Sequence, residues 1–127
     1  MSQWQWKFQV RGSFVRAESG DFVSPCEAIV ESGVRDDDSP FSFAGVGPIA
    51  RADSTGTFHS WFVTRGTDAR AQCPSTVSVF VRVGRGQWKP YVVAVAPSQC
   101  TEIAPTELLL DLGNVRIGQQ ETPYVAP

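Results

Sequence analysis

The stretch Ser75-Thr76-Val77-Ser78-Val79-Phe80-Val81-Arg82-Val83 decides the fold class of this chain. Valine occupies every second position from Val77 onward, and side chains two residues apart point to the same face of a β-strand. The pattern therefore predicts a strand whose core-facing side chains are Val77, Val79, Val81 and Val83. By the same alternation, Phe80 is expected on the opposite, outer face of the sheet.

Turn residues and alternating apolar residues extend this pattern along the chain. Gly84-Arg85-Gly86 predicts a tight turn, because glycine adopts positive φ without strain, and residues 87–96 are expected to return as the hairpin partner. A second hairpin is expected around the turn Asp53-Ser54-Thr55-Gly56, and a last one around Leu112-Gly113. The other strands are expected over residues 5–10, 26–34, 49–52, 57–63, 107–111 and 114–118.

The overall composition favours one all-β domain. The chain has 127 residues, of which 42% are hydrophobic, so it can bury a core. Its 16 Val and 4 Ile against 4 Leu and 1 Met favour strands over helices. We therefore predict a single domain over 1–127, with its core in 5–118 and a C-terminal tail at 119–127. The expected fold is a seven-stranded antiparallel Greek-key β-sandwich.

The charge balance and the apolar runs exclude two classes of partner. Lys and Arg number 11 against 13 Asp and Glu, a net charge of −2 that argues against a nucleic-acid binder. No apolar run approaches the roughly 18 residues that span a bilayer. The opening MSQWQWKFQV lacks the basic end and long apolar stretch of a signal peptide.

Three motifs carry a resemblance to a known family. Val10-Arg11-Gly12-Ser13-Phe14-Val15, followed by Gly20 and Pro25, resembles the opening of transthyretin-like domains of the carboxypeptidase-regulatory type. Ala52-Asp53-Ser54-Thr55-Gly56-Thr57-Phe58 and Leu110-Asp111-Leu112-Gly113-Asn114-Val115 resemble the hairpin and closing motifs of the same family. The resemblance implies a transthyretin-like (prealbumin-like) β-sandwich. It implies no single function, because this scaffold has many roles.

Residue counts argue against an enzyme. Intradiol dioxygenases of this general fold hold iron with two Tyr and two His, whereas this chain has one His and two Tyr. The transthyretin-related hydroxyisourate hydrolases close on Tyr-Arg-Gly-Ser, which this chain lacks, and no strained nucleophile turn such as G-x-S-x-G is present. We expect no catalytic residue, no cofactor and no metal site. Whether the run Asp36-Asp37-Asp38 binds calcium stays open, since its spacing is not that of an EF-hand loop.

Aromatic side chains are the candidate binding residues. The resemblance implies that Phe58 points inward, so that Trp61 and His59 on the opposite face of that strand point outward. Phe80 is out of phase with the valines around it. Exposed aromatic residues that cluster mark binding surfaces, and the expected set is Trp61, Phe80, Trp88 and Tyr91. The alternative is that the long segment 22–48 covers these aromatic residues.

The preferred function is a non-catalytic β-sandwich module that mediates protein–protein contact or serves as an accessory domain. The alternative is a carbohydrate-binding module that uses the same aromatic residues, so the partner is expected to be a protein or a polysaccharide. The identity of the partner and the oligomeric state are left open.

The three cysteines predict one disulfide and one free thiol. Residues whose numbers sum to about 170 face each other across the hairpin around Gly84-Arg85-Gly86, and Cys73 and Cys100 come close to that sum. A Cys73–Cys100 disulfide is therefore expected in an oxidising, extracytoplasmic compartment, whereas in the cytoplasm both thiols would stay reduced. Cys26 is expected to be a small buried residue.

Overall fold

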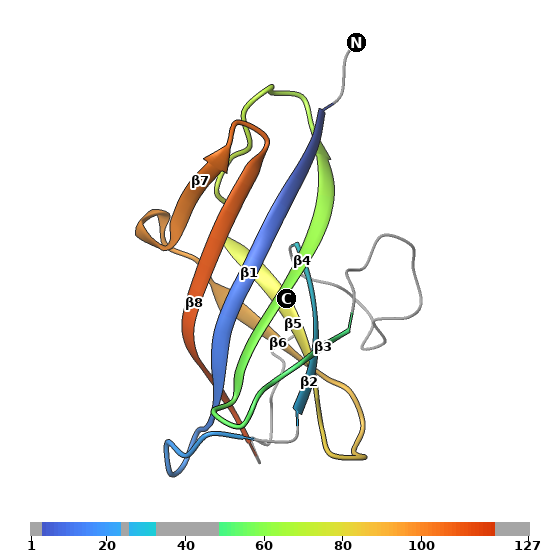
Figure 1. Ribbon diagram of the computed structural model, residues 1–127, viewed down its shortest axis with the longest axis vertical. Coiled ribbons are helices and arrows are strands. Elements are labelled where there is room, and N and C mark those ends of the chain that lie inside the picture. Colours follow the sequence, from blue (N-terminus) through green and yellow to red (C-terminus); the bar gives the residue numbers. More distant parts are fainter. Residues whose placement is uncertain (1–3, 24–25, 33–48, 119–127) are drawn as a thin grey trace.

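The computed structural model in Figure 1 describes residues 4–23, 26–32 and 49–118, which form two four-stranded sheets. Sheet A has the strand order β4-β1-β8-β7, and sheet B has the order β3-β2-β5-β6. The strands of sheet A are β1 (Trp4–Arg16), β4 (Thr57–Gly66), β7 (Cys100–Ala104) and β8 (Glu107–Ile117). Those of sheet B are β2 (Cys26–Ser32), β3 (Ala50–Arg51), β5 (Thr76–Val83) and β6 (Lys89–Ala94).

The core lies between the two sheets and follows the alternation along each strand. On sheet A, Phe8 stacks on Phe62 with ring centroids 5.0 Å apart, and Phe14 stacks on Phe58 at 4.4 Å. On sheet B, the expected core residues Val77, Val79 and Val81 are buried in the same cluster. Val83 was also expected there, but it is 40% exposed because it ends β5 at the edge of the core. The all-β class with two sheets is confirmed.

The strand pairing departs from an entirely antiparallel sandwich. β1 pairs with β8 in parallel, and β4 lies antiparallel on the other side of β1. The described residues form eight strands rather than seven, and one short 3₁₀ helix, η1 (Pro97–Gln99), precedes β7. No helix in these residues is long and apolar enough to cross a membrane.

The expected turn around Leu112-Gly113 is a bulge within one continuous strand. In the β1–β8 register, Arg11 pairs with Asp111 but Ser13 pairs with Asn114, so Leu112 and Gly113 together oppose Gly12. Gly113 has φ +67°, which suits the extra residue of a β-bulge. The hairpin partner of β8 is β7, a strand that the sequence pattern did not predict.

The motif glycine Gly12 lies where β1, β4 and β8 approach one another closely. It pairs with Phe58 of β4, and a Cβ placed on it would lie 3.0 Å from the Gly113 carbonyl oxygen and 3.1 Å from the Phe58 ring. Only a residue without a side chain fits there without moving a neighbour. The three family-like motifs thus meet in space around one position.

The turn Asp53-Ser54-Thr55-Gly56 has the expected chemistry but a different place in the fold. An Asp53 carboxylate oxygen accepts hydrogen bonds from the Thr55 and Thr57 amides and from the Thr55 hydroxyl. These hydrogen bonds, led by that of the Thr55 side chain, hold the pKa of Asp53 below its ordinary value. The turn carries the chain from β3 in sheet B to β4 in sheet A, so the expected hairpin is instead a crossing between sheets.

Candidate functional site

The four aromatic candidates do not form one surface. Trp61 lies on β4 in sheet A and is 39% exposed, whereas Trp88 is half-buried in the loop between β5 and β6 of sheet B. Phe80 is 0% exposed and Tyr91 is 8% exposed. The expectation that Phe80 and Tyr91 are exposed is therefore wrong.

The two buried side chains lie on opposite faces of sheet B. Phe80 points away from the core, as the alternation predicts, but it pairs in register with Ile29 on one side and Pro90 on the other, and both are buried. Tyr91 belongs to the core cluster between the sheets, so burial raises the pKa of its hydroxyl above the ordinary value. Most of segment 22–48, which was the alternative cover for these aromatic residues, lies outside the described residues.

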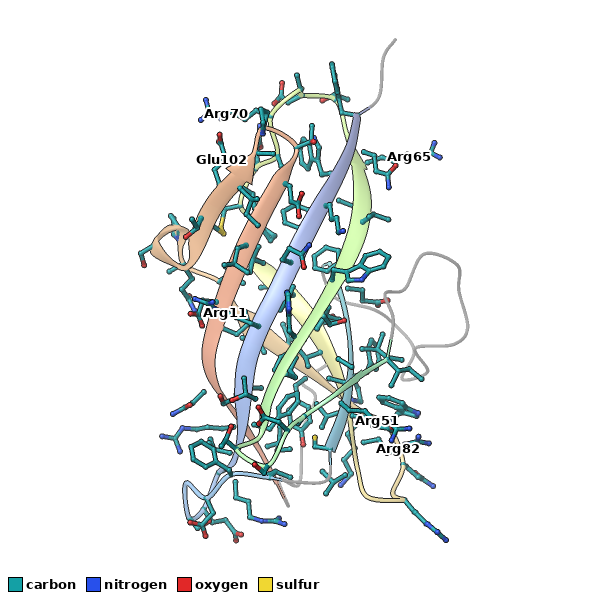
Figure 2. The ribbon with its side chains drawn as sticks, in the orientation of Figure 1. Arg11, Arg51, Arg65, Arg70, Arg82 and Glu102 are labelled. Carbon is teal, nitrogen blue, oxygen red and sulfur yellow. A yellow bond between two sulfur atoms is a disulfide. The ribbon has the colours of Figure 1, made fainter. Side chains whose placement is uncertain are left out.

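Of the four candidates, Trp61 is exposed, and it lies on the outer face of sheet A. His59 points outward on the same strand, as expected. The strands of this sheet bring their outward residues into rows: Gln9 of β1 pairs with Trp61 on one side and with Leu109 of β8 on the other. Arg11 likewise lies between His59 and Asp111. In Figure 2, charged residues frame this sheet, with Arg65 beside the upper end of β4 and the ion pair Arg70–Glu102 beside the upper end of β7.

Hydrogen bonds hold the polar side chains of this face in place. The Gln9 amide nitrogen donates to Glu107 Oε2 over 2.9 Å, and the Gln9 amide oxygen lies 2.9 Å from His59 Nε2. Because an amide oxygen only accepts, the His59 Nε2 carries the proton. Arg11 forms an ion pair of 3.2 Å with Asp111. The polar row is therefore preorganised before any ligand binds.

A shallow hollow of about 380 Å³ lies in this face. Its walls are His59, Gln9 and Arg11 on one side and Leu109 and Ile103 on the other. Ile103 is 53% exposed, and Trp61 lies beside the hollow with the Lys7 ammonium 5.0 Å from its ring centroid. Sequence reasoning missed Ile103 because β7 was not predicted. It missed Leu109 because three consecutive leucines hide the alternation.

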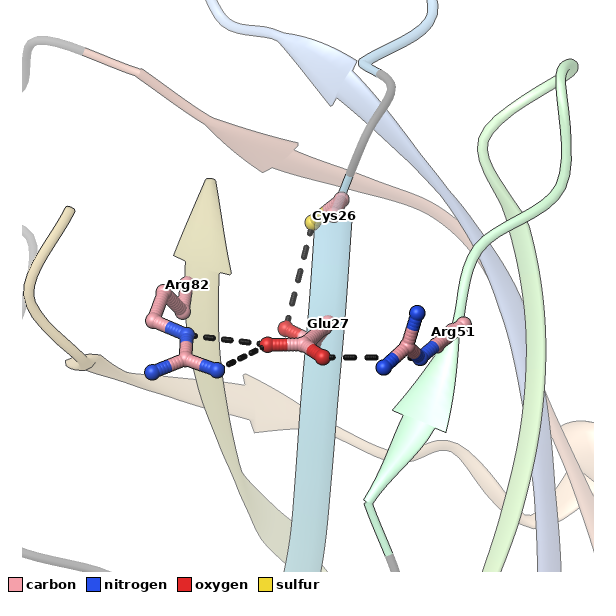
Figure 3. A network of polar contacts seen from close by, with 4 residues as sticks. All are labelled: Cys26, Glu27, Arg51 and Arg82. Atoms are coloured by element: carbon pink, nitrogen blue, oxygen red, sulfur yellow. Dashed lines mark hydrogen bonds and ion pairs between the residues drawn. The ribbon is translucent and has the colours of Figure 1, made fainter. Parts of the chain in front are cut away.

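Trp88 contacts a charged cluster on sheet B that consists of Glu27, Arg51 and Arg82. Figure 3 shows these three charged residues. Arg82 donates to the Glu27 carboxylate through Nε, over 2.9 Å, and through Nη2, while Arg51 lies 3.6 Å from the other carboxylate oxygen. The Arg82 guanidinium also lies 5.0 Å from the centroid of the Trp88 ring. One face of Trp88 thus supports the Arg82–Glu27 pair, which gives this residue a structural contact.

The Cys73–Cys100 disulfide is present, with 6.1 Å between the Cα atoms. Cys73 precedes β5 of sheet B and Cys100 begins β7 of sheet A, so the bond ties the segments of two sheets together. Cys26 is free and buried, as expected, and burial raises its thiol pKa to about 12.

The acidic run Asp36-Asp37-Asp38 lies outside the described residues. Within 4–23, 26–32 and 49–118, no group of three or more His, Cys, Asp or Glu side chains is arranged to hold a metal ion.

Comparison with known proteins adds little to this description. No family model matches the chain, and no curated protein matches it. One solved structure that aligns with this chain is the dioxygenase domain of a novel dioxygenase carbohydrate-binding protein fusion from the cellulolytic bacterium Streptomyces sp. SirexAA-E. It is 10% identical, the alignment covers 89% of this chain and 81% of that chain, and the TM-score is 0.46. A likeness at this level does not bear on what this protein binds or catalyses.

Proposed function

We propose that this protein is a non-catalytic binding module whose binding surface is the outer face of sheet A. The observation that carries the proposal is the exposure of Trp61 and Ile103 beside a hollow whose polar walls are already hydrogen-bonded to one another. The hydrogen bonds that fix His59 and Gln9 support a binding role over a catalytic one. Within the described residues the His59 ring bonds to an amide, not to the carboxylate that orients a catalytic histidine.

A protein partner fits the layout of this face. That face places the apolar side chains Trp61, Leu109 and Ile103 on the same surface as charged ones, among them Lys7 and the Arg11–Asp111 pair. Aromatic and apolar groups mixed with a few polar ones are common in protein–protein interfaces. Tryptophan and arginine are also the residue types that most often dominate such interfaces.

Affinity capture tests this assignment. The immobilised protein is exposed to extracts of its source organism, next to a Trp61→Ala/Ile103→Ser variant and a Phe22→Ala control. Phe22 is an exposed aromatic residue outside the sheet A face. We expect one protein to be retained by the wild type and the control and lost by the double variant. Equal retention by all three proteins would refute a partner site on this face.

A carbohydrate ligand is the second candidate, and the row Trp61–Gln9 favours it. Aromatic rings pack against the apolar faces of sugars, and Gln9, His59 and Glu107 present fixed polar groups beside that ring. Affinity electrophoresis in gels that contain soluble polysaccharides tests this candidate. Retardation of the wild type that disappears in Trp61→Ala alone would favour carbohydrate over a protein partner, and no retardation in any gel would exclude the polysaccharides tried.

Two further proposals concern family and compartment. We propose a transthyretin-like relationship of the carboxypeptidase-regulatory type. The meeting of the three motifs around Gly12 supports it. We also propose an extracytoplasmic location, because disulfides such as Cys73–Cys100 persist in oxidising compartments. Non-reducing mass spectrometry of the protein from its source tests the second proposal, since recovery with all cysteines reduced would overturn it.

A further inference from the structure

A second cavity lies between the two sheets, at one end of the sandwich. It is separate from the hollow on the outer face of sheet A. This end pocket has a volume of about 420 Å³ and opens where β1 and β8 end and the β5–β6 loop begins. Its inner walls are Val23, Val81, Tyr91 and Ile117, all members of the buried core. Arg16 and Lys89 also line it and are exposed at the surface.

The size and lining of the end pocket suit a small organic ligand. Ligand pockets usually enclose about 300–1,000 Å³ and are lined mainly by apolar side chains with a few placed polar groups. The inner walls are aliphatic apart from Tyr91, whose hydroxyl lies 3.5 Å from the Gly118 amide and so bridges the two sheets at this end. Gln87 also lines the pocket. An apolar ligand body would gain from leaving water in such a site.

The cations at the mouth define the polar end of the ligand. Within the described residues, neither the Arg16 nor the Lys89 side chain has a hydrogen bond or an ion pair, in contrast to Arg11, Arg70 and Arg82. Guanidinium and ammonium groups only donate hydrogen bonds, so the complementary group is an anionic acceptor. A highly hydrated multivalent anion such as phosphate would gain nothing from the apolar walls.

We propose that the end pocket binds a small amphiphilic carboxylate, with an alkyl or aryl body between Val23 and Ile117 and its carboxylate beside Arg16 and Lys89. The site is separate from the outer face of sheet A, so the proposal stands or falls independently of the proposed function. Octanoate is a suitable probe, octan-1-ol is its neutral counterpart, and inorganic phosphate is the anion without an apolar body.

Titration of the ¹⁵N-labelled protein, followed by amide chemical shifts, tests the proposal. Octanoate at up to about 5 mM should give saturable shifts at Gly86, Gln87, Lys89 and Gly118. Octan-1-ol should bind at least about twofold more weakly, and phosphate should give no saturable shift. Absence of saturable octanoate shifts, or shifts confined to the sheet A face, would overturn the proposal.

Variants separate the two parts of the site. The exposed pair Arg16→Gln/Lys89→Gln should weaken octanoate binding at least about twofold while leaving octan-1-ol unaffected. Arg85→Gln, in the same β5–β6 loop but outside the pocket lining, is the matched control. Val83→Trp adds bulk at the lining and should weaken both probes. Trp61→Ala should leave octanoate binding unchanged. Equal octanoate affinity of the wild type and the Arg16/Lys89 variant would refute the role of the cations.

Discussion

Loss of the Cys73–Cys100 disulfide should remove a large share of the stability of this domain. The two residues are 27 apart in sequence, and the bond joins the segment before β5 to the start of β7. In the chain-entropy model, closing a loop of that length stabilises the folded state by about 3.5 kcal/mol, because it restricts the unfolded chain. Domains of this size are stable by only about 5–15 kcal/mol, so a Cys73→Ser/Cys100→Ser variant should be markedly weakened.

Urea unfolding followed by circular dichroism measures this loss. Oxidised wild type should exceed the double variant by about 3.5 kcal/mol. Reductant should lower the wild type to the level of the variant and leave the variant unchanged, because its remaining thiol, Cys26, has no partner to lose. A difference below about 1 kcal/mol would refute the reasoning. So would a thiol titration of unfolded, unreduced wild type that finds all 3 cysteines free instead of one.

Three further predictions follow from buried or constrained positions. Phe80→Ser should cost about 3–5 kcal/mol, because the side chain is 0% exposed, and a thermal unfolding midpoint within about 2 °C of wild type would contradict this. Gly56→Ala should lower the free energy of unfolding more than Gly84→Ala, although both glycines have positive φ. A Cβ at Gly56 would lie 2.7 Å from the Phe14 carbonyl oxygen, whereas a Cβ at Gly84 would have no heavy atom within 4 Å. Urea unfolding of the two variants checks that order, and equal losses would contradict the clash. Cys26 should resist iodoacetamide at pH 8 until the protein unfolds, because burial raises its pKa to about 12. With the folded pKa above the ordinary value of 9.0, the neutral thiol contributes stability below that pH, and this contribution should fall as pH rises towards 12.

Local alternation allowed the inner and outer faces of several strands to be predicted. Phe8 on β1, Phe58 on β4 and Val79 on β5 all face the core, as their period of two indicates. The direction of a side chain within a strand depends only on its neighbours in sequence, so it can be inferred without knowledge of the fold. The same holds for Asp53, whose hydrogen bonds lie within its own turn.

The topology could not be predicted in the same way, because it depends on partners far away in sequence. Gly113 has the positive φ that both a turn and a bulge require, so local chemistry does not distinguish them. What makes it a bulge is the parallel alignment of β8 along β1, in which two residues oppose Gly12. Likewise, the turn after Asp53 has one local structure whether it joins strands of one sheet or of two.

Phe80 and Trp61 show why a binding surface is harder to predict than a strand. Both point away from the core, as alternation indicates, yet Phe80 is buried and Trp61 is exposed. Alternation predicts the face to which a side chain points, but not what packs over that face. Within the sheets, Phe80 lies between Ile29 and Pro90, whereas Trp61 lies beside Gln9. A stability measurement distinguishes the two residues: Phe80→Ser should cost about 3–5 kcal/mol, whereas Trp61→Ala should cost less, because Trp61 is 39% exposed, and should remove ligand binding. If Trp61→Ala destabilised the protein as much as Phe80→Ser, Trp61 would be part of the packing, and the outer face of sheet A would lose the residue on which its proposed binding role rests.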